Sequence, residues 1–300
     1  MKTRLDVFLT ERGDFPSRQK AQAAIMAGLV YMDGQIADKA GTQVTGDEEI
    51  EVRGSDCPYV SRGGFKLEKA LDVFGIDVSG LSCLDIGAST GGFTDCMLQR
   101  GAARVYAVDV GTNQLDWKLR SDPRVVCMEK TNFRYADGSL IPERVDFACT
   151  DVSFISLKHI LPPARLLLRD GGGMVCLIKP QFEAGREQVG KNGIIRDPAV
   201  HLEVILRVCE YAAENGFTVK DLNYSPVKGG KGNIEFLAFL EKEPDEASSL
   251  EEAPEGGSPV AEADEASGAR GCADASDLSL EDMARKAVSE AHAALDERQA

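Results

Sequence analysis

The sequence predicts an α/β protein whose main domain is a mostly parallel seven-stranded sheet, with a small α+β domain before it and a disordered acidic tail after it. Segments with strand and helix spacing alternate from residue 66 to residue 240, the pattern of a parallel sheet covered on both faces. Two helical segments and several short strand-like segments fill residues 1–53. Beyond residue 241 the chain is mostly Glu, Ala, Ser, Gly and Pro, with little to bury.

Charge separates these parts of the chain. Residues 241–300 contain 17 acidic and 5 basic side chains, whereas residues 1–240 contain 32 and 29. The low isoelectric point therefore belongs to the tail, and the nearly neutral body is not prevented from binding nucleic acid. We expect domains at residues 1–57 and 58–241 and a tail at 242–300, with Pro58 at the first change because proline cannot continue a strand centre.

The first domain is predicted to be a helix pair joined to a small sheet. Ser17 has the position of a helix cap, and the Asp33-Gly34 pair marks a hairpin turn. The predicted elements are a helix from Leu5 that ends before Gly13, a helix from Ser17 to Gly28, a strand over 29–32, a short strand-like segment at Ile36 and a strand over 41–52.

The main domain alternates helix and strand. The predicted helices cover residues 66–74, 92–99 and 197–215, and the predicted strands cover 83–86, 104–108, 125–128, 145–149, 174–178, 218–224 and 234–240. Asp197-Pro198 has the residues of a helix cap and first turn, and Pro162-Pro163 must break or restart a helix within residues 155–168. In the tail only residues 279–298 have helical spacing, and we expect that helix to be solvated.

Several classes of protein are disfavoured. The eight cysteines form no Cys-x-x-Cys pair, so we expect neither a zinc site nor a disulfide framework. No apolar run approaches the ~18 residues of a membrane span, and the first residues contain no apolar signal core. We therefore expect a cytoplasmic protein without metal or membrane partners. Its oligomeric state does not follow from the sequence.

A glycine-rich turn after the first strand of the main domain indicates a cofactor site. The turn reads Leu84-Asp85-Ile86-Gly87-Ala88-Ser89-Thr90-Gly91-Gly92-Phe93. A dinucleotide fingerprint has glycine where this chain has Ser89, so a pyrophosphate could not approach closely. The spacing fits a cofactor without phosphate, and S-adenosylmethionine is the obvious one. Asp109 closes the next strand, where a carboxylate can accept hydrogen bonds from ribose hydroxyls.

The first domain resembles the small RNA-binding domain shared by ribosomal protein S-four, pseudouridine synthases and tyrosyl-tRNA synthetases. The resemblance lies in Ser17-Arg18-Gln19-Lys20-Ala21, Ala27-Gly28-Leu29-Val30 and Asp33-Gly34. It implies that basic side chains contact RNA phosphates without reading bases, and the candidates are Arg4, Arg18, Lys20 and Lys39. A solvated charged face is the alternative explanation of the same residues.

The main domain resembles the FtsJ-type RNA ribose methyltransferases, a family with a Rossmann-like fold. Ser61-Arg62-Gly63-Gly64-Phe65-Lys66-Leu67 and the glycine-rich turn carry this resemblance. Further motifs narrow it to the TlyA branch: Thr150-Asp151-Val152-Ser153-Phe154, Ile178-Lys179-Pro180-Gln181-Phe182-Glu183, and Ser225-Pro226 ahead of Gly232-Asn233-Ile234-Glu235. The likeness covers residues 2–241 and fails only in the tail.

The resemblance implies roles for particular residues. Lys66, Asp151, Lys179 and Glu235 match a catalytic Lys-Asp-Lys-Glu tetrad, in which Lys179 is the cation beside the attacking oxygen and a candidate acceptor of its proton, and Lys66 bridges the two acids. The implied cofactor residues are Asp85, Gly87, Ser89, Gly91, Gly92, Phe93, Asp109, Asn132 and Phe133. Arg62, Lys191 and Arg196 are further candidates for RNA contacts, Lys191 in a loop over the site.

Other methyl acceptors fit the sequence less well. An amino-directed enzyme usually has Asn/Asp-Pro-Pro-aromatic after the fourth strand, where this chain has Asp151-Val152-Ser153-Phe154. A cytosine-carbon enzyme needs a nucleophilic cysteine there, whereas Cys149 is predicted inside a buried strand. We therefore expect 2′-O-methylation of ribosomal RNA. In its short segment before Leu5, the chain resembles the branch whose members modify a cytidine of the large subunit only. A noncatalytic RNA-binding or ribosome-assembly factor and a haemolysin are the alternatives.

Overall fold

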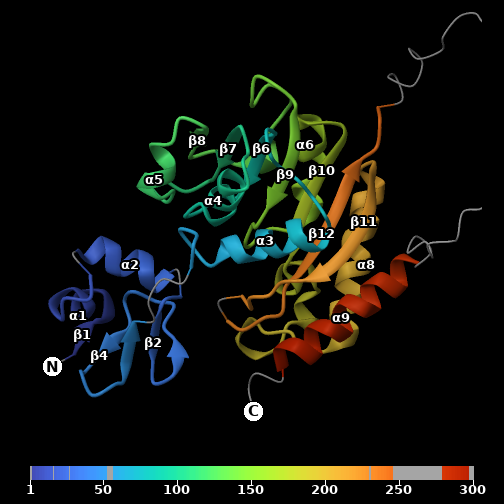
Figure 1. Cartoon of the computed structure of the whole chain (residues 1–300). Helices are drawn as coiled ribbons and strands as arrows, with labels where there is room; N and C mark the ends of the chain where they lie inside the picture. The colour runs from blue at the N-terminus through green and yellow to red at the C-terminus, as the bar shows by residue number, and fades with distance from the viewer. Residues whose placement is uncertain are drawn as a thin grey trace, which may run out of the picture.

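The structure, a computed structural model, describes residues 2–15, 17–26, 28–52, 57–229, 231–245 and 279–296. Figure 1 shows a small N-terminal domain beside a larger domain built on one sheet, with helix α3 (Gly63–Val73) following the connection between them. The C-terminal helix α9 (Leu280–Asp296) lies on the larger domain.

The N-terminal domain has the predicted helix pair. Helices α1 (Leu5–Glu11) and α2 (Arg18–Met26) pack together, and the Ser17 hydroxyl accepts a hydrogen bond from the Lys20 amide at 3.3 Å, as a cap does. The strands are β1 (Thr3–Arg4), β2 (Val30–Met32), β3 (Gln35–Ile36), β4 (Gln43–Val44) and β5 (Ile50–Val52). They form a three-stranded sheet in the order β3-β2-β5 and a separate pair, β1-β4.

The predicted single strand over residues 41–52 is wrong. A turn at residues 45–49 divides it into β4 and β5, which belong to different sheets. The Glu48 carboxylate accepts hydrogen bonds from the Thr45 and Gly46 amides, and Gly46 has a positive φ of 94°. This side-chain bonding to the backbone satisfies amides that a continuous strand would have used in a ladder.

The main domain contains the predicted mostly parallel seven-stranded sheet. Its strand order is β11-β12-β10-β9-β6-β7-β8, and β12 alone runs antiparallel to the other strands. The strands are β6 (Ser82–Ile86), β7 (Arg104–Val108), β8 (Val125–Met128), β9 (Val145–Thr150), β10 (Leu168–Ile178), β11 (Phe217–Tyr224) and β12 (Phe236–Lys242). Each predicted strand of this domain is therefore present.

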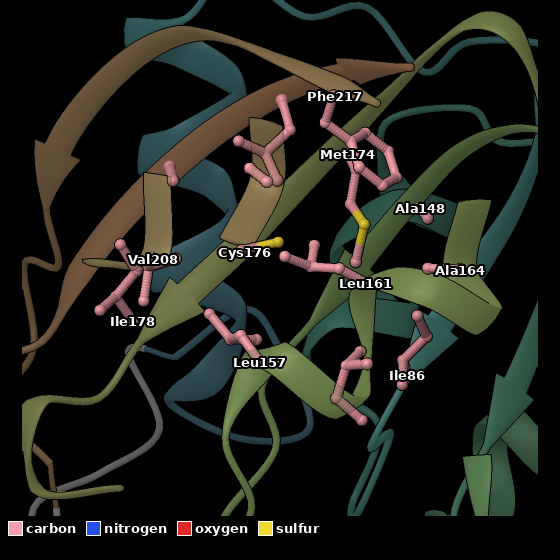
Figure 2. Close-up of a cluster of buried hydrophobic side chains, with 14 of the residues drawn as sticks. Ile86, Ala148, Leu157, Leu161, Ala164, Met174, Cys176, Ile178, Val208 and Phe217 are labelled. Carbon is pink, nitrogen blue, oxygen red and sulfur yellow. The ribbon is translucent and has the colours of Figure 1, made fainter. Parts of the chain in front are cut away.

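Helices cover both faces of the sheet, and each face has its own core. Side chains of α3, α4 (Gly92–Gln99) and α5 (Trp117–Arg120) pack on one face. Side chains of α6 (Leu161–Leu167), α8 (Pro198–Glu214) and α9 pack on the other. Figure 2 shows this second core, where Met174 and Ala148 of the sheet lie near Leu161, and Ile178 lies beside Val208. Burial on both faces explains why these strands read as continuous apolar runs.

Prolines fix two helix starts as predicted. Pro162 and Pro163 lie in the first turn of α6, after a short 3-10 turn at Leu157–His159, so the helix restarts there. In α8 the Asp197 carboxylate accepts a hydrogen bond from the Ala199 amide at 2.9 Å. The remaining short elements are α7 (Pro180–Glu183) and 3-10 turns at Phe133–Tyr135, Arg186–Gln188 and Lys191–Gly193.

The expectation that the C-terminal helix is solvated is wrong. Helix α9 packs against α8 and β11, and its apolar stripe is buried: Ala284, Ala287, Val288, Ala291 and Leu295 are at most 6 % exposed. His292 of α9 lies 3.0 Å, Nε2 to Nδ1, from His201 of α8, whose side chain is fully buried. Residues 246–278 of the predicted tail lie outside the described residues.

Substitution of Ala291 by Asp should undock α9, because this position is fully buried and a carboxylate is costly to bury. We expect amide exchange within α9 to accelerate at least ~30-fold, as loss of about 2 kcal/mol of docking free energy implies. Hydrogen–deuterium exchange measures the effect. Ala293→Asp is the matched control, since Ala293 is exposed on the same helix. Equal exchange in the two variants would contradict the docking seen here.

Candidate active site

Polar side chains gather at the carboxyl edge of the parallel sheet. The neighbouring strands β6, β9 and β10 end at Ile86, Thr150 and Ile178, so Gly87, Asp151 and Lys179 emerge together. Open α/β sheets keep their ligand sites at this edge. Helix α3 and the segment before β12 bring Lys66 and Glu235 to the same place.

The four residues of the predicted tetrad form a chain of alternating charges. The Lys66 ammonium lies 2.7 Å from the Glu235 carboxylate and 3.2 Å from Asp151 Oδ2. The Lys179 ammonium lies 2.6 Å from the other oxygen of Asp151, Oδ1. Lys66, Lys179 and Glu235 are each at most 8 % exposed. The structure thus brings the tetrad together, with Lys66 between the two acids, while the catalytic roles stay predictions.

Electrostatics keep Asp151 and Lys66 ionised. Burial alone would raise the pKa of Asp151, but the positive charges of Lys66 and Lys179 outweigh burial and lower that pKa to about 2. Burial would likewise lower the pKa of Lys66, and the charges of Asp151 and Glu235 raise it instead. Asp151 therefore remains a carboxylate at neutral pH, with an ammonium on either side.

One polar contact of the cluster was missed by the sequence reasoning. The Lys179 ammonium donates a hydrogen bond to the Ser153 hydroxyl at 2.9 Å. Ser153 belongs to the motif that supplies Asp151, but a serine in a loop after a strand carries no signal of its own. Ser153 nevertheless contacts the Lys179 ammonium directly.

The glycine-rich turn has the geometry of a cradle. Gly87 has a φ of +84°, and a Cβ built on it would come within 2.9 Å of the Val152 side chain. Gly91 caps helix α4 with a φ of +96°. Only glycine adopts such angles without strain, which explains the residue type at both positions. Ser89, where a dinucleotide fingerprint has glycine, is exposed and has a φ of +49°.

Two acidic side chains accept hydrogen bonds from this turn and from the helix that follows it. The Asp109 carboxylate accepts hydrogen bonds from the Ser89 amide at 2.8 Å and the Gly111 amide at 2.7 Å, which leaves further acceptor positions on its oxygens. Asp85 is fully buried and accepts a hydrogen bond from the Thr94 hydroxyl at 2.6 Å. Burial raises the pKa of Asp85 to about 7.

A cavity of about 470 Å³ adjoins the turn, a size typical of ligand pockets. Five of the predicted cofactor residues line it: Gly87, Ser89, Asp109, Asn132 and Phe133. The glycine cradle, the free acceptor positions of Asp109 and the ring of Phe133 offer what the methionine chain, ribose and adenine of S-adenosylmethionine need. The residues present therefore fit this cofactor. Gly92 and Phe93 line the adjoining larger cleft.

The larger cleft, of about 1120 Å³, lies between the two domains. Its walls include Lys66, Asp151 and Lys179 from the main domain and Met26, Gln35 and Ile36 from the N-terminal domain. Gly87, Ser89, Asp151 and Ser153 line both this cleft and the smaller cavity, so the two spaces meet beside the Lys179 ammonium.

The predicted RNA-binding residues fall into three places. Arg4 and Arg18 are half-exposed and both contact the buried Asp6 carboxylate, at 3.0 Å and 2.9 Å, while Lys20 and Lys39 are exposed on the same domain. Arg62 lines the larger cleft. Arg196 is exposed beyond the loop that contains Lys191, and the structure does not describe the Lys191 side chain. These residues are not brought into one cluster by any contact described.

The described residues contain neither a metal-binding cluster nor a membrane-spanning helix. In the ranges that the structure describes, no group of three or more His, Cys, Asp or Glu side chains is placed to hold a metal ion. Among the same residues, no helix combines the length and apolarity that crossing a bilayer requires.

Comparisons with known proteins match both domains. The family model described as FtsJ-like methyltransferase matches residues 59–242, and the S4 domain model matches residues 3–50. The 16S/23S rRNA (cytidine-2'-O)-methyltransferase TlyA of Mycobacterium tuberculosis is 44% identical over 249 residues, covering 83% of this chain and 93% of the relative. Hemolysin A of Brachyspira hyodysenteriae is 44% identical over 238 residues, covering 79% and 99%.

A solved structure gives the same result for the fold. A Streptococcus thermophilus protein, provisionally named a hemolysin, superposes with a TM-score of 0.72 at 45% identity, covering 99% of this chain and 98% of that one. The two resemblances predicted from the sequence motifs are therefore confirmed.

The buried Asp85 should make stability depend on pH. Its pKa of about 7 in the folded protein exceeds the ~3.9 of an unfolded chain, so its contribution is complete below pH ~4 and declines as the pH rises through 7. Asp85→Asn removes this titration. We expect the free energy of unfolding of the natural protein, relative to the variant, to fall by roughly 2–4 kcal/mol between pH 4 and pH 8. Denaturant unfolding at each pH measures this, and parallel curves would show that Asp85 does not titrate there.

Proposed function

Because this chain belongs to the FtsJ-like methyltransferase family, we propose that it transfers the methyl group of S-adenosylmethionine to a ribose 2′-hydroxyl of ribosomal RNA. The proposed acceptor is a cytidine of the large subunit. Its partner is then the ribosomal subunit or its RNA, and its place of action is the cytoplasm. The names of the relatives support the substrate class, and the site geometry supports the chemistry.

A single observation carries the proposal: the Lys179 ammonium is held where the cofactor-sized cavity meets the interdomain cleft. A 2′-hydroxyl is a weak nucleophile whose oxygen gains negative charge as it attacks, so a fixed cation beside that oxygen lowers the barrier. The bound cofactor supplies a methyl group on a positively charged sulfur, which is already an excellent leaving group. The protein needs to add position and electrostatic stabilisation.

The tetrad residues divide this work. Lys179 donates a hydrogen bond to the 2′-oxygen and stabilises its developing charge. Asp151 holds that ammonium at 2.6 Å, and its pKa of about 2 makes it an orienting anion and a poor proton acceptor. Lys66 and Glu235 keep Asp151 in place, since Lys66 contacts both acids. The proton of the hydroxyl passes to solvent water on the open side of the cleft.

The cofactor residues act by shape and hydrogen bonding. Gly87, Ser89 and Gly91 would hold the methionine moiety, and the unused acceptor positions of Asp109 would bind the ribose hydroxyls. Asn132 and Phe133, which line the same cavity, border the adenine. Asp85 supports the turn from within the core, where Thr94 holds its carboxyl group.

The N-terminal domain binds RNA through phosphates. Arg4 and Arg18 are fixed by the buried Asp6, and the pKa of this carboxyl lies well below its usual value because Arg4, then Gln22 and Arg18, donate hydrogen bonds to it against the effect of burial. One acid between two arginines leaves a net positive face for the RNA backbone. Residues of this domain also line the larger cleft, so an RNA strand in the cleft touches both domains.

Lys179→Ala should abolish transfer while leaving the cofactor site intact. Removal of one preorganised donor to a developing oxyanion costs about 10²–10³ in rate, and loss of the charge makes the upper end the expectation. Transfer of tritium from labelled S-adenosylmethionine to rRNA measures the rate, and calorimetry measures cofactor affinity, which we expect to change less than ~3-fold.

Lys220→Ala is the control for that experiment, because Lys220 is an exposed lysine on β11 whose partner is Glu241. It should transfer at the natural rate. No transfer by the natural protein, or equal transfer by both variants, would favour the noncatalytic RNA-binding factor.

Lys20→Ala should weaken RNA binding without a change in sequence preference. Lys20 is exposed on the helix that also presents Arg18, so its loss removes about one phosphate contact and lowers the slope of log affinity against log salt by about 1. Filter binding to an rRNA fragment at several salt concentrations measures this. Lys286→Ala on α9 is the control, and an equal slope for the two variants would exclude Lys20 from the RNA interface.

A further inference from the structure

Ser153 contacts the Lys179 ammonium and belongs to no part of the predicted tetrad. Its hydroxyl accepts a hydrogen bond from Lys179 Nζ at 2.9 Å. It lies two residues after Asp151, on the loop that leaves strand β9. Its side chain is exposed to the cleft, whereas Lys179 is 8 % exposed.

An ammonium group has three N–H bonds, and two neighbouring groups occupy two of its sides here. The Ser153 hydroxyl accepts a hydrogen bond at 2.9 Å, and Asp151 Oδ1 forms an ion pair at 2.6 Å without hydrogen-bond alignment. The ion pair alone would let the ammonium turn about the Cε–Nζ bond. The aligned hydrogen bond to Ser153 fixes that rotation, so the direction of the third N–H is fixed as well.

The third N–H is available at the place where the reaction must occur. Asp151 and Ser153 both line the cofactor-sized cavity and the interdomain cleft, and Lys179 lines the cleft. A substrate oxygen in the cleft and a methyl group in the cavity therefore meet beside this group. The orientation of the third N–H decides whether the oxygen receives a straight hydrogen bond, and hydrogen bonds weaken steeply as they bend.

The loop that carries Ser153 is itself anchored to the segment that carries Lys179. Glu183, at the end of helix α7, accepts hydrogen bonds from the Ser156 hydroxyl at 2.6 Å and the Leu157 amide at 2.8 Å. Helix α7 begins directly after Lys179. The two loops therefore keep a fixed distance, and the contact between Ser153 and Lys179 is a built feature of the site.

We propose that Ser153 is a positioning residue of the methyl transfer, which directs the third N–H of Lys179 at the attacking 2′-oxygen. This inference rests on the proposed function of the same site. The hydroxyl neither binds the methyl group nor takes the proton. It acts through Lys179, and it favours attack by an oxygen nucleophile that approaches the ammonium from the cleft.

Ser153→Ala tests the proposal through a separation of kinetic constants. Loss of a hydrogen bond to a charged group should lower kcat about 10- to 100-fold. The KM for S-adenosylmethionine should change less than ~3-fold, because ground-state binding does not use this contact. Ser153→Thr keeps the hydroxyl and should restore kcat to within ~3-fold of the natural protein.

Ser156→Ala is the matched control, because it removes a hydroxyl from the same loop whose partner is Glu183 and not Lys179. It should lower the melting temperature and keep kcat within ~3-fold. Equal loss of kcat in the two alanine variants, or failure of Ser153→Thr to restore it, would assign Ser153 a structural role only and overturn the proposal.

A readout without catalysis separates this inference from the proposed function. Nitrogen-15 relaxation of the Lys179 ammonium reports its rotation about the Cε–Nζ bond. We expect that rotation to be several-fold faster in Ser153→Ala and unchanged in Ser156→Ala. Unchanged rotation in Ser153→Ala would overturn the proposed fixing of the ammonium. A natural protein that transfers no methyl group to rRNA would overturn the proposed function instead, whatever the rotation shows.

Discussion

The whole site depends on one carboxylate held between two ammonium groups. Asp151 has Lys66 on one oxygen and Lys179 on the other, and Glu235 closes the chain beyond Lys66. Three of these four side chains are at most 8 % exposed, so each charge would be costly to bury alone. Together they satisfy one another, and removal of one member of a buried set typically costs about 3–5 kcal/mol. The same arrangement that makes the cluster tolerable inside the protein leaves Lys179 as a positive charge at the edge of the cleft.

The fold explains why these charges meet and what they face. The strands β6, β9 and β10 are neighbours in the sheet, so the loops after them share one edge. Helix α3, which packs on one face of the sheet, contributes Lys66. The N-terminal domain closes the other side of the cleft with Met26, Gln35 and Ile36. Arg62 belongs to the connection between the domains and approaches Gly28 so closely that a Cβ there would come within 2.8 Å of its guanidinium. Substrate binding and chemistry therefore share one space.

Sequence periodicity predicted most of the fold because the main domain follows local rules. Strands that are apolar on both faces, the glycine turn at residues 87–92 and the proline-started helices were all identified from short windows. The docking of α9 was missed, since a stripe of alanines does not show whether a partner surface exists far away in the chain. The division of residues 41–52 was missed because Glu48 uses its side chain to close a turn. The tetrad came from a family resemblance, whereas Ser153 matters only through a contact with Lys179 26 residues away.

The central claim is that Lys179 stabilises the 2′-oxygen of the ribose as it attacks the methyl group. The identity of the methylated atom tests this claim most directly. Ribosomal subunits without this modification can be incubated with the protein and S-adenosylmethionine bearing a deuterated methyl group, then digested to nucleosides and analysed by mass spectrometry. The account predicts the label in 2′-O-methylcytidine, on the ribose fragment. Label on a base, or no label in the RNA, would contradict it.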